Sequence, residues 1–166
     1  LSLFWKRFID IFLLLISCPL TLPVTFVVAL LIKITSPGPV FYGHKRSGKN
    51  GKEFKCWKFR SMVIDADKQL EKILAENPEM RQEWEKDRKF TNDPRVTKIG
   101  KILRKTSIDE LPQFFNVLTG EMSFVGPRPV TEPELVKYGN KAKFILSVKP
   151  GLSGMWQISG RSDTGY

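Results

Sequence analysis

An acidic pair, Asp109-Glu110, has the clearest capacity for chemistry in this sequence. Ser107 stands three residues before Glu110, which is the spacing of a capping box at the start of a helix. The apolar run that follows ends at Gly120, as a helix with a glycine just past its end would. Unpaired backbone N–H groups and the helix dipole favour ionised carboxylates in a first turn. An ionised aspartate placed there could attack phosphorus or hold a divalent cation.

A purely structural interpretation of the pair competes with this one, because most acidic pairs at helix starts act only as caps. Pro112 also lies early in the predicted helix, where it removes a hydrogen bond. We therefore expect an irregular helix start, or one displaced by a residue or two. The surroundings of the pair must decide whether it is catalytic.

Basic residues dominate the composition. The sequence has 27 Lys and Arg against 17 Asp and Glu, a net charge of +10 and a pI of about 9.7. This balance predicts a polyanionic partner: nucleic acid, an anionic membrane face or a phosphorylated substrate. Two cysteines without zinc or disulfide spacing fit a reducing compartment. The single histidine, His44, excludes a site built from several histidines.

The segment from Phe8 to Ile32 is apolar enough to enter a membrane. Its length just spans a hydrocarbon core of about 30 Å. Pro19 and Pro23 interrupt its middle, and basic residues flank both ends, so the positive-inside rule gives no orientation. These residues leave two alternatives open: a kinked helix that spans the membrane, or a re-entrant helix that enters and leaves by one face.

A basic β-hairpin is predicted over residues 40–62, after the helix-breaking turn Ser36-Pro37-Gly38-Pro39. Asn50-Gly51 is typical of the hairpin loop. Most of the lysines here are expected to form a solvated edge. Lys58 and Arg60 differ, because they point to the same side near the end of the second strand. They are therefore candidate phosphate ligands.

Two charged helices are predicted over residues 65–76 and 78–88, with Asn77-Pro78 as the cap of the second. Asp65-Ala66-Asp67 matches the D-x-D sequence of metal-dependent glycosyltransferases. Its position at the start of a predicted helix favours a structural role instead.

A basic amphipathic helix is predicted to start at Asp93-Pro94 and to lead into the acidic pair. Apolar residues fall on its other side, and its basic residues are Arg95, Lys98, Lys101, Arg104 and Lys105. Such a helix fits either an interfacial position against anionic headgroups or a solvated face over an ordinary core. In both cases Arg104 and Lys105 arrive beside Asp109, where cations would assist chemistry on a phosphate.

Two further segments could hold a nucleoside diphosphate. Pro127 and Pro129 fix the backbone around Arg128, and a pre-placed guanidinium can bind two phosphate oxygens at once. The glycine-rich stretch 149–161 could wrap a nucleotide, with Gln157 on a base edge and Arg161 close by. Neither a Walker A sequence nor G-x-G-x-x-G occurs, so the familiar phosphate loops are excluded.

Five motifs stand in one order along the chain. They are Lys6-Arg7-Phe8-Ile9-Asp10, Trp57-Lys58-Phe59-Arg60-Ser61-Met62, Ser107-Ile108-Asp109-Glu110-Leu111-Pro112-Gln113, Phe124-Val125-Gly126-Pro127-Arg128-Pro129 and Lys149-Pro150-Gly151-Leu152-Ser153-Gly154. Together they resemble the bacterial sugar transferases, which are monotopic phosphoglycosyl transferases. The resemblance implies an Mg²⁺-dependent ping-pong reaction: a hexose 1-phosphate moves from a UDP-sugar to undecaprenyl phosphate, and UMP is released.

The resemblance also implies a role for each matching residue. Asp109 would be the nucleophile that takes the phosphosugar covalently, Glu110 would assist it, and the two would hold Mg²⁺. Arg104 would meet the polyprenyl phosphate, and Arg128 would meet the diphosphate of the donor. A basic pair near the N-terminus would lie at the lipid headgroup: Lys6 and Arg7.

The membrane helix of the family is re-entrant and breaks at a Ser-Pro pair. Leu22-Pro23 matches that pair here, and Ser17 or Thr21 would replace the missing serine. The resemblance therefore favours the re-entrant alternative, at the bacterial inner membrane with the catalytic domain on the cytoplasmic face. Residues 154–163 are most similar to members that use UDP-galactose or UDP-glucose.

We expect a mainly helical α/β (α+β) fold with a small antiparallel hairpin and interfacial amphipathic helices. Residues 1–35 would form the membrane-inserted segment, and residues 36–166 a catalytic domain that lacks its C-terminal segment. Nucleic acid is not expected as a partner, and a homodimer is compatible with the sequence. Two alternatives remain: a non-catalytic basic module that binds membranes or polyanions, and a glycosyltransferase that uses Asp65 and Asp67 and releases UDP.

Overall fold

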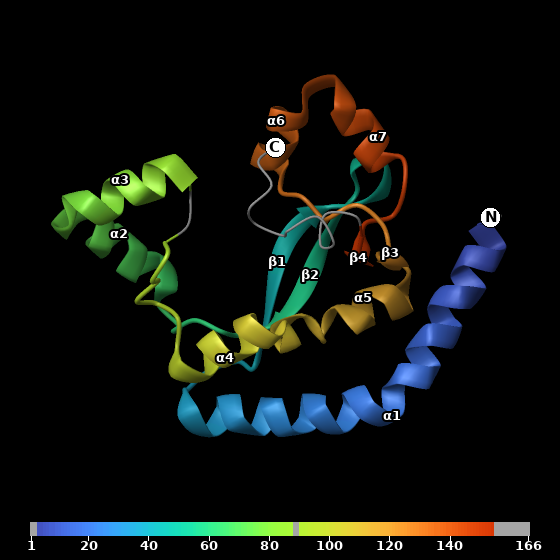
Figure 1. Cartoon of the computed structure of the whole chain (residues 1–166), viewed down its shortest axis with the longest axis horizontal. Coiled ribbons are helices and arrows are strands. Elements are labelled where there is room, and N and C mark those ends of the chain that lie inside the picture. The colour runs from blue at the N-terminus through green and yellow to red at the C-terminus, as the bar shows by residue number, and fades with distance from the viewer. Residues whose placement is uncertain (1–2, 88–89, 155–166) are drawn as a thin grey trace.

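The computed structural model describes residues 3–87 and 90–154 of the chain (Figure 1). The fold is mainly helical α+β with one antiparallel hairpin, as predicted. Its helices are α1 (Leu3–Thr35), α2 (Ala66–Glu76), α3 (Pro78–Asp87), α4 (Lys98–Thr106), α5 (Gln113–Thr119), α6 (Glu132–Tyr138) and α7 (Ala142–Leu146). Its strands are β1 (Phe41–Ser47), β2 (Glu53–Phe59), β3 (Ser123–Val125) and β4 (Gly151–Ser153). Short 3₁₀ turns occupy Lys49–Gly51, Ile108–Glu110 and Gly139–Lys141.

Helix α1 is a single α-helix of 33 residues that contains both prolines. Figure 1 shows that it changes direction midway, so the predicted break is a bend in a continuous helix. Two hydroxyls near the bend bond helix carbonyls: Ser17 Oγ donates to Leu14 O at 2.8 Å, and Thr21 Oγ1 to Ser17 O at 3.0 Å. Such bonds favour bending of a helix. The helix is long and apolar enough to cross a membrane by length and composition.

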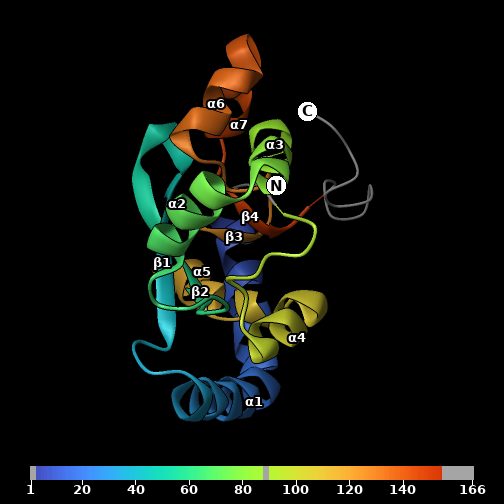
Figure 2. The ribbon, with the colours of Figure 1, turned by 90° about the vertical axis from the view of Figure 1, so that its left-hand side faces the viewer.

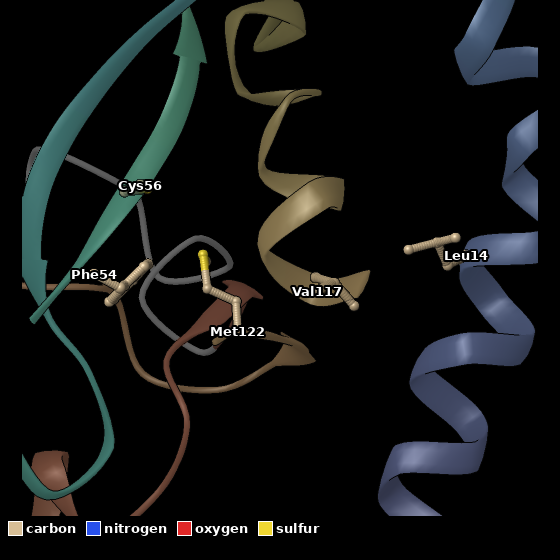
Figure 3. Close-up of a cluster of buried hydrophobic side chains, with 5 residues drawn as sticks. All are labelled: Leu14, Phe54, Cys56, Val117 and Met122. Atoms are coloured by element: carbon tan, nitrogen blue, oxygen red, sulfur yellow. The ribbon is translucent and has the colours of Figure 1, made fainter. Parts of the chain in front are cut away.

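Two small cores attach α1 to the rest of the described chain. The first joins Leu14 of α1 to β2, to α5 and to the residue before β3, and consists of Leu14, Phe54, Cys56, Val117 and Met122 (Figure 3). The second joins the C-terminal half of α1 to the end of β2 and to α4, through Val28, Ile32, Phe59 and Leu103. Most other apolar side chains of α1 stay exposed, which leaves a long apolar surface along the helix.

The hairpin and its loop follow local sequence signals. Strands β1 and β2 pair antiparallel with Phe41 opposite Phe59 and His44 opposite Cys56. Asn50, in the loop, has φ of 59°, a left-handed conformation that Asn tolerates well, and Gly51 follows at 76°. A second pair, β3 and β4, is parallel and was not predicted. Figures 1 and 2 show it close to the hairpin.

The predicted start of α4 at Asp93-Pro94 is wrong. The helix begins at Lys98, with the Thr97 hydroxyl accepting the Gly100 N–H at 3.0 Å. Asp93 instead pairs with Arg95 at 2.7 Å, and Arg95 is buried against the rings of Trp84 and Phe90. Arg95 therefore does not belong to a basic interfacial face, because its charge is neutralised inside the protein.

The predicted capping box between Ser107 and Glu110 is also wrong. Ser107 ends α4 in a left-handed conformation with φ of 60°, and its hydroxyl does not cap the turn that follows. The acidic pair lies in that 3₁₀ turn, and α5 begins only after Pro112. The irregular start that Pro112 predicted is thus confirmed, although α5 begins five residues after Ile108 and not one or two. Gly120 is confirmed as the C-cap, with φ of 80°.

Candidate active site

A cleft of about 620 Å³ lies between the hairpin, the 3₁₀ turn and the segment that carries Arg128. The cleft floor includes Asp109 and Glu110 from the turn. Strand β2 contributes Lys58, and the end of α4 contributes Arg104. Residues more than 40 positions apart in sequence are therefore brought to one polar site.

Lys58 and Glu110 form the best-defined ion pair of the cleft. Lys58 Nζ lies 2.7 Å from Glu110 Oε1, and about a third of the Lys58 side chain stays exposed (32%). The bond holds the acidic turn against β2. It also places an ammonium group beside Asp109, the residue that precedes Glu110.

Asp109 differs from Glu110 in being buried, with 8% of its surface exposed. Burial raises the pKa of the Asp109 carboxyl above its usual value, and the neighbouring Glu110 also raises it. The charges of Lys58 and Arg104 act in the opposite direction and lower this pKa. A buried carboxylate flanked by two cations is desolvated and oriented, which suits a nucleophile that must attack an anionic phosphate.

Arg104 reaches the cleft because α4 packs tightly on the strand end. Its Nε donates to Ser61 Oγ at 2.8 Å. The Thr97 N–H donates to the Ser61 carbonyl at 3.1 Å. Gly100 allows this approach, since a Cβ there would overlap the Ser61 carbonyl group. The position of the Arg104 guanidinium thus depends on a residue without a side chain one turn earlier in the helix.

The opposite wall of the cleft carries Arg128 beside a second charged cluster. Arg46 lies 2.9 Å from Glu134 Oε2, and Arg128 Nη2 lies 3.9 Å from Glu134 Oε1. Glu134 belongs to a true capping box at the start of α6, where it accepts the Thr131 N–H at 2.7 Å. Nearly half of the Arg128 side chain is exposed (45%).

The cleft brings together six of the predicted site residues: Lys58, Arg60, Arg104, Asp109, Glu110 and Arg128. Lys105 is exposed at the end of α4 and does not line the cleft. Gln157 and Arg161 lie outside the described residues. Asp67 lines the cleft near the start of α2, whereas Asp65 does not.

Arg60 is directed away from the acidic turn although it lines the cleft. Its Nη2 donates to the Ser36 carbonyl at 2.9 Å, just after α1 ends. Nη1 lies under Gly38, and both Nη1 and Nε are enclosed without a hydrogen-bond partner among the described residues. In this geometry Arg60 fixes the turn between α1 and β1, so a phosphate could reach it only after a rearrangement.

The basic pair of α1 lies outside the cleft. Lys6 Nζ donates to the Val125 carbonyl at 2.9 Å. Arg7 donates to the last carbonyls of α5, with Nη2 at 2.7 Å from Leu118 O, which is favourable at the negative end of a helix. These contacts tie the start of α1 to β3 and to α5, the helix that follows the acidic turn.

Sequence reasoning missed two buried polar residues that position these elements. Asp10 accepts the Ser123 hydroxyl at 2.9 Å and the Phe124 N–H at 3.0 Å. Asn116 accepts the Trp57 N–H at 3.1 Å and donates to the Lys55 carbonyl at 2.8 Å. A lone charged residue within an apolar segment, such as Asp10, is a signal that could have indicated a buried partner.

The donor set for a metal consists of two carboxylates. Within residues 3–87 and 90–154, no group of three or more His, Cys, Asp or Glu side chains could hold a metal ion. Mg²⁺ usually takes only one or two protein carboxylates and completes its shell with waters and substrate phosphates. Asp109 and Glu110 therefore fit Mg²⁺ bound together with a diphosphate.

The model of the bacterial sugar transferase family matches residues 1–166, so the chain belongs to that family. The undecaprenyl-phosphate galactose phosphotransferase of Salmonella typhimurium is 49% identical over 99% of this chain and 34% of that protein. The exopolysaccharide production protein ExoY of Rhizobium meliloti is 49% identical over 97% of the chain and 71% of that protein.

A third relative is the UDP-glucose:undecaprenyl-phosphate glucose-1-phosphate transferase of Escherichia coli. It is 43% identical over 93% of the chain and 31% of that protein. The chain thus spans about a third of the Salmonella and Escherichia relatives and most of the Rhizobium one.

The ion pair predicts a large effect of Lys58→Met. Loss of the ammonium group leaves Glu110 without its partner and Asp109 with one flanking cation fewer. We expect the rate of sugar-phosphate transfer to fall about 100-fold, the scale of losing one preorganised donor that stabilises a transition state. Lys55→Met is the matched control, because Lys55 lies on the same strand but is exposed and outside the cleft. Equal rates for the two variants would contradict a role of Lys58 in the site.

Proposed function

We propose that this chain transfers a hexose 1-phosphate from a UDP-sugar to undecaprenyl phosphate and releases UMP, as the first membrane step of exopolysaccharide, capsule or O-antigen synthesis. The single observation that carries this is the buried Asp109 on a turn flanked by Lys58 and Arg104, beside an apolar helix. The names of the relatives support both substrates, and UDP-galactose and UDP-glucose are the favoured donors.

In the first step, an Asp109 carboxylate oxygen attacks the phosphorus that carries the sugar. A bond forms between that oxygen and phosphorus, and the bridging P–O bond breaks, so UMP leaves with the bridging oxygen. Arg128 would bind the diphosphate of the donor, and Lys58 would orient Glu110. The product of this step is a phosphosugar held covalently on Asp109.

In the second step, a phosphate oxygen of the lipid attacks the same phosphorus. The bond to Asp109 breaks, the free carboxylate is restored, and the lipid carries a diphosphate-linked sugar. Arg104 would hold the lipid phosphate, since its guanidinium is anchored on Ser61 close to the acidic turn. When bound by Asp109 and Glu110, Mg²⁺ would neutralise phosphate charge in the transition state.

The membrane placement follows the same proposal. The bent helix α1 would enter the inner membrane and return to the cytoplasmic face, so that the cleft stands at the level of the lipid phosphates. Exposed aromatic residues at its start, Phe4, Trp5 and Phe8, suit the membrane interface. A helix that spans the membrane instead would expose its two ends to opposite faces, which accessibility labelling of its termini distinguishes.

The leaving nucleotide tests the proposed function. Protein in detergent or lipid is incubated with Mg²⁺, undecaprenyl phosphate and a panel of UDP-sugars, and the nucleotide products are separated. We expect UMP, and with one sugar only. UDP as the product would instead support a glycosyltransferase that uses Asp65 and Asp67.

A second arm of this experiment tests the non-catalytic alternative. A basic binding module predicts salt-sensitive binding to any polyanion and neither nucleotide product. Absence of both UMP and UDP with every donor would therefore contradict transfer by this chain.

A further inference from the structure

A second, apolar groove of about 430 Å³ lies between α1 and α5. Helix α1 contributes Cys18, Leu22 and Thr25 to it, and α5 contributes Phe115 and Leu118. The groove crosses the bent part of α1, where Pro19 and Pro23 stand. Its volume lies within the range of roughly 300–1,000 Å³ that is usual for ligand sites.

The groove adjoins the active-site cleft at the start of the hairpin and at the acidic turn. Phe41 lines both cavities. Leu111 and Pro112 line the groove and directly follow Asp109 and Glu110, which line the cleft. A ligand that is anionic at one end and apolar along its length would therefore place its charged end at the acidic turn and its chain in the groove.

The lining chemistry favours hydrocarbon. The groove is walled by aliphatic and aromatic side chains, and the Thr21 hydroxyl is already bonded to a helix carbonyl at 3.0 Å. Leu22, Phe115 and Leu118 are all at least half exposed, so apolar walls face open space. A nucleotide sugar would lose its hydrogen bonds to water here, which excludes the donor as the occupant.

We propose that this groove binds the first isoprene units of the polyprenyl phosphate acceptor and so directs its phosphate into the cleft. The proposal rests on the proposed function for the identity of the acceptor. Bilayer hydrocarbon is as apolar as the groove, so burial of the chain itself gains little free energy. The contribution of the groove is to hold the acceptor with its phosphate at the cleft, which lowers the concentration of acceptor needed for transfer.

Leu22→Trp tests the groove, because a larger side chain at its wall would obstruct the chain. We expect the KM for undecaprenyl phosphate to rise about tenfold with little change in kcat, as expected when a substitution weakens acceptor binding equally in the ground state and the transition state. UMP release from the donor without acceptor should be unchanged. Leu20→Trp is the matched control, since Leu20 is also exposed on α1 but does not line the groove. Equal KM values for the two variants would overturn the proposal.

Acceptor length gives the same test a second arm. With a phosphate on a chain too short to reach α1, Leu22→Trp and the wild type should have the same KM. A tenfold difference that persists with the short acceptor would show that the substitution acts on the cleft and not on the groove, which would also overturn the proposal.

Protection of a thiol gives a readout that does not depend on transfer. Cys18 lines the groove and is partly exposed, whereas Cys56 is buried and its pKa is raised by burial to about 11, so it should react slowly. Undecaprenyl phosphate should slow alkylation of Cys18 by an apolar maleimide severalfold more than a membrane phospholipid at equal concentration. Equal protection by both lipids would overturn the assignment of the occupant.

These measurements separate the two proposals. If no UMP forms with any donor, the proposed function fails, and Cys18 protection still decides whether the groove binds the polyprenyl chain. If UMP forms but Leu22→Trp behaves as Leu20→Trp, the function stands and the groove assignment is wrong.

Discussion

Asp109→Asn is expected to abolish sugar-phosphate transfer, with UMP release at least about 1,000-fold slower than in the wild type, because an amide cannot serve as the nucleophile. The covalent phosphosugar should also be absent from the variant. Release of UMP from a labelled UDP-sugar measures the rate, and intact-protein mass spectrometry measures the adduct. A variant that releases UMP at the wild-type rate would show that Asp109 is not the nucleophile.

The same substitution should leave the fold intact, which separates lost chemistry from lost structure. Burial raises the pKa of the Asp109 carboxyl in the folded protein, so its ionisation opposes folding as the pH rises through that pKa. A neutral amide at this position has no charge to bury, so the loss of stability from the ionised carboxylate at neutral pH disappears. The Tm of the variant should therefore be equal to or above that of the wild type.

The matched control for Asp109→Asn is Asp65→Asn. Asp65 is exposed before α2 and does not line the cleft. Full activity is expected of this variant. Loss of activity with Asp65→Asn, together with retained activity of Asp109→Asn, would support the D-x-D alternative.

Gly100→Ala should produce the largest loss of stability. In an exposed helix, alanine would be favoured over glycine by about 1 kcal/mol. Here a Cβ would overlap the backbone carbonyl of Ser61, which a rotamer change cannot relieve. We expect the overlap to outweigh helix propensity and to lower the free energy of unfolding by about 3 kcal/mol, the scale of overpacking in a buried contact.

The contact between Gly100 and Ser61 also determines where Arg104 lies in the active site. If α4 moves away from Ser61, the bond from Arg104 Nε to Ser61 Oγ is lost. Transfer of the phosphosugar from Asp109 to the lipid phosphate should then slow more than UMP release. Denaturation in detergent measures the stability, and Lys101→Ala in the same helix, at an exposed position, is the control. A Gly100→Ala variant as stable as Lys101→Ala would contradict the tight packing of α4.

Several parts of the molecule were determined by the sequence through local signals. Asn77 caps α3 with its side chain 3.1 Å from the Met80 N–H, as the Asn77-Pro78 pair predicted. Gly120 and Asn50-Gly51 take the left-handed conformations that their types favour. The apolar composition of residues 8–32 predicted a long helix that lies either in membrane hydrocarbon or in the protein core. These features depend on neighbours a few residues away, so their sequence patterns were sufficient.

The candidate site was predictable in its residues but not in its geometry. Asp109, Glu110, Arg104, Lys58 and Arg128 could be selected from residue type and motif order. That Lys58 pairs with Glu110, and that Arg104 rests on Ser61, depends on residues 52 and 43 positions apart. Pairing across such distances is decided by how the hairpin and α4 pack on the turn, which spacing along the chain does not encode.

The errors of prediction have the same physical origin. Asp93 and Ser107 are good capping residues by type, yet in each case a cation bonds the carboxylate that the predicted cap would have used. Arg95 bonds the Asp93 carboxylate, and Lys58 bonds the Glu110 carboxylate. A charged partner in a buried or half-buried place outweighs a cap worth about 1 kcal/mol. The sequence by itself thus determined which residues could do chemistry and which segment could enter a membrane. Only the tertiary structure decided which cations meet the acidic turn, because desolvated charges bind the partner that packing brings within reach.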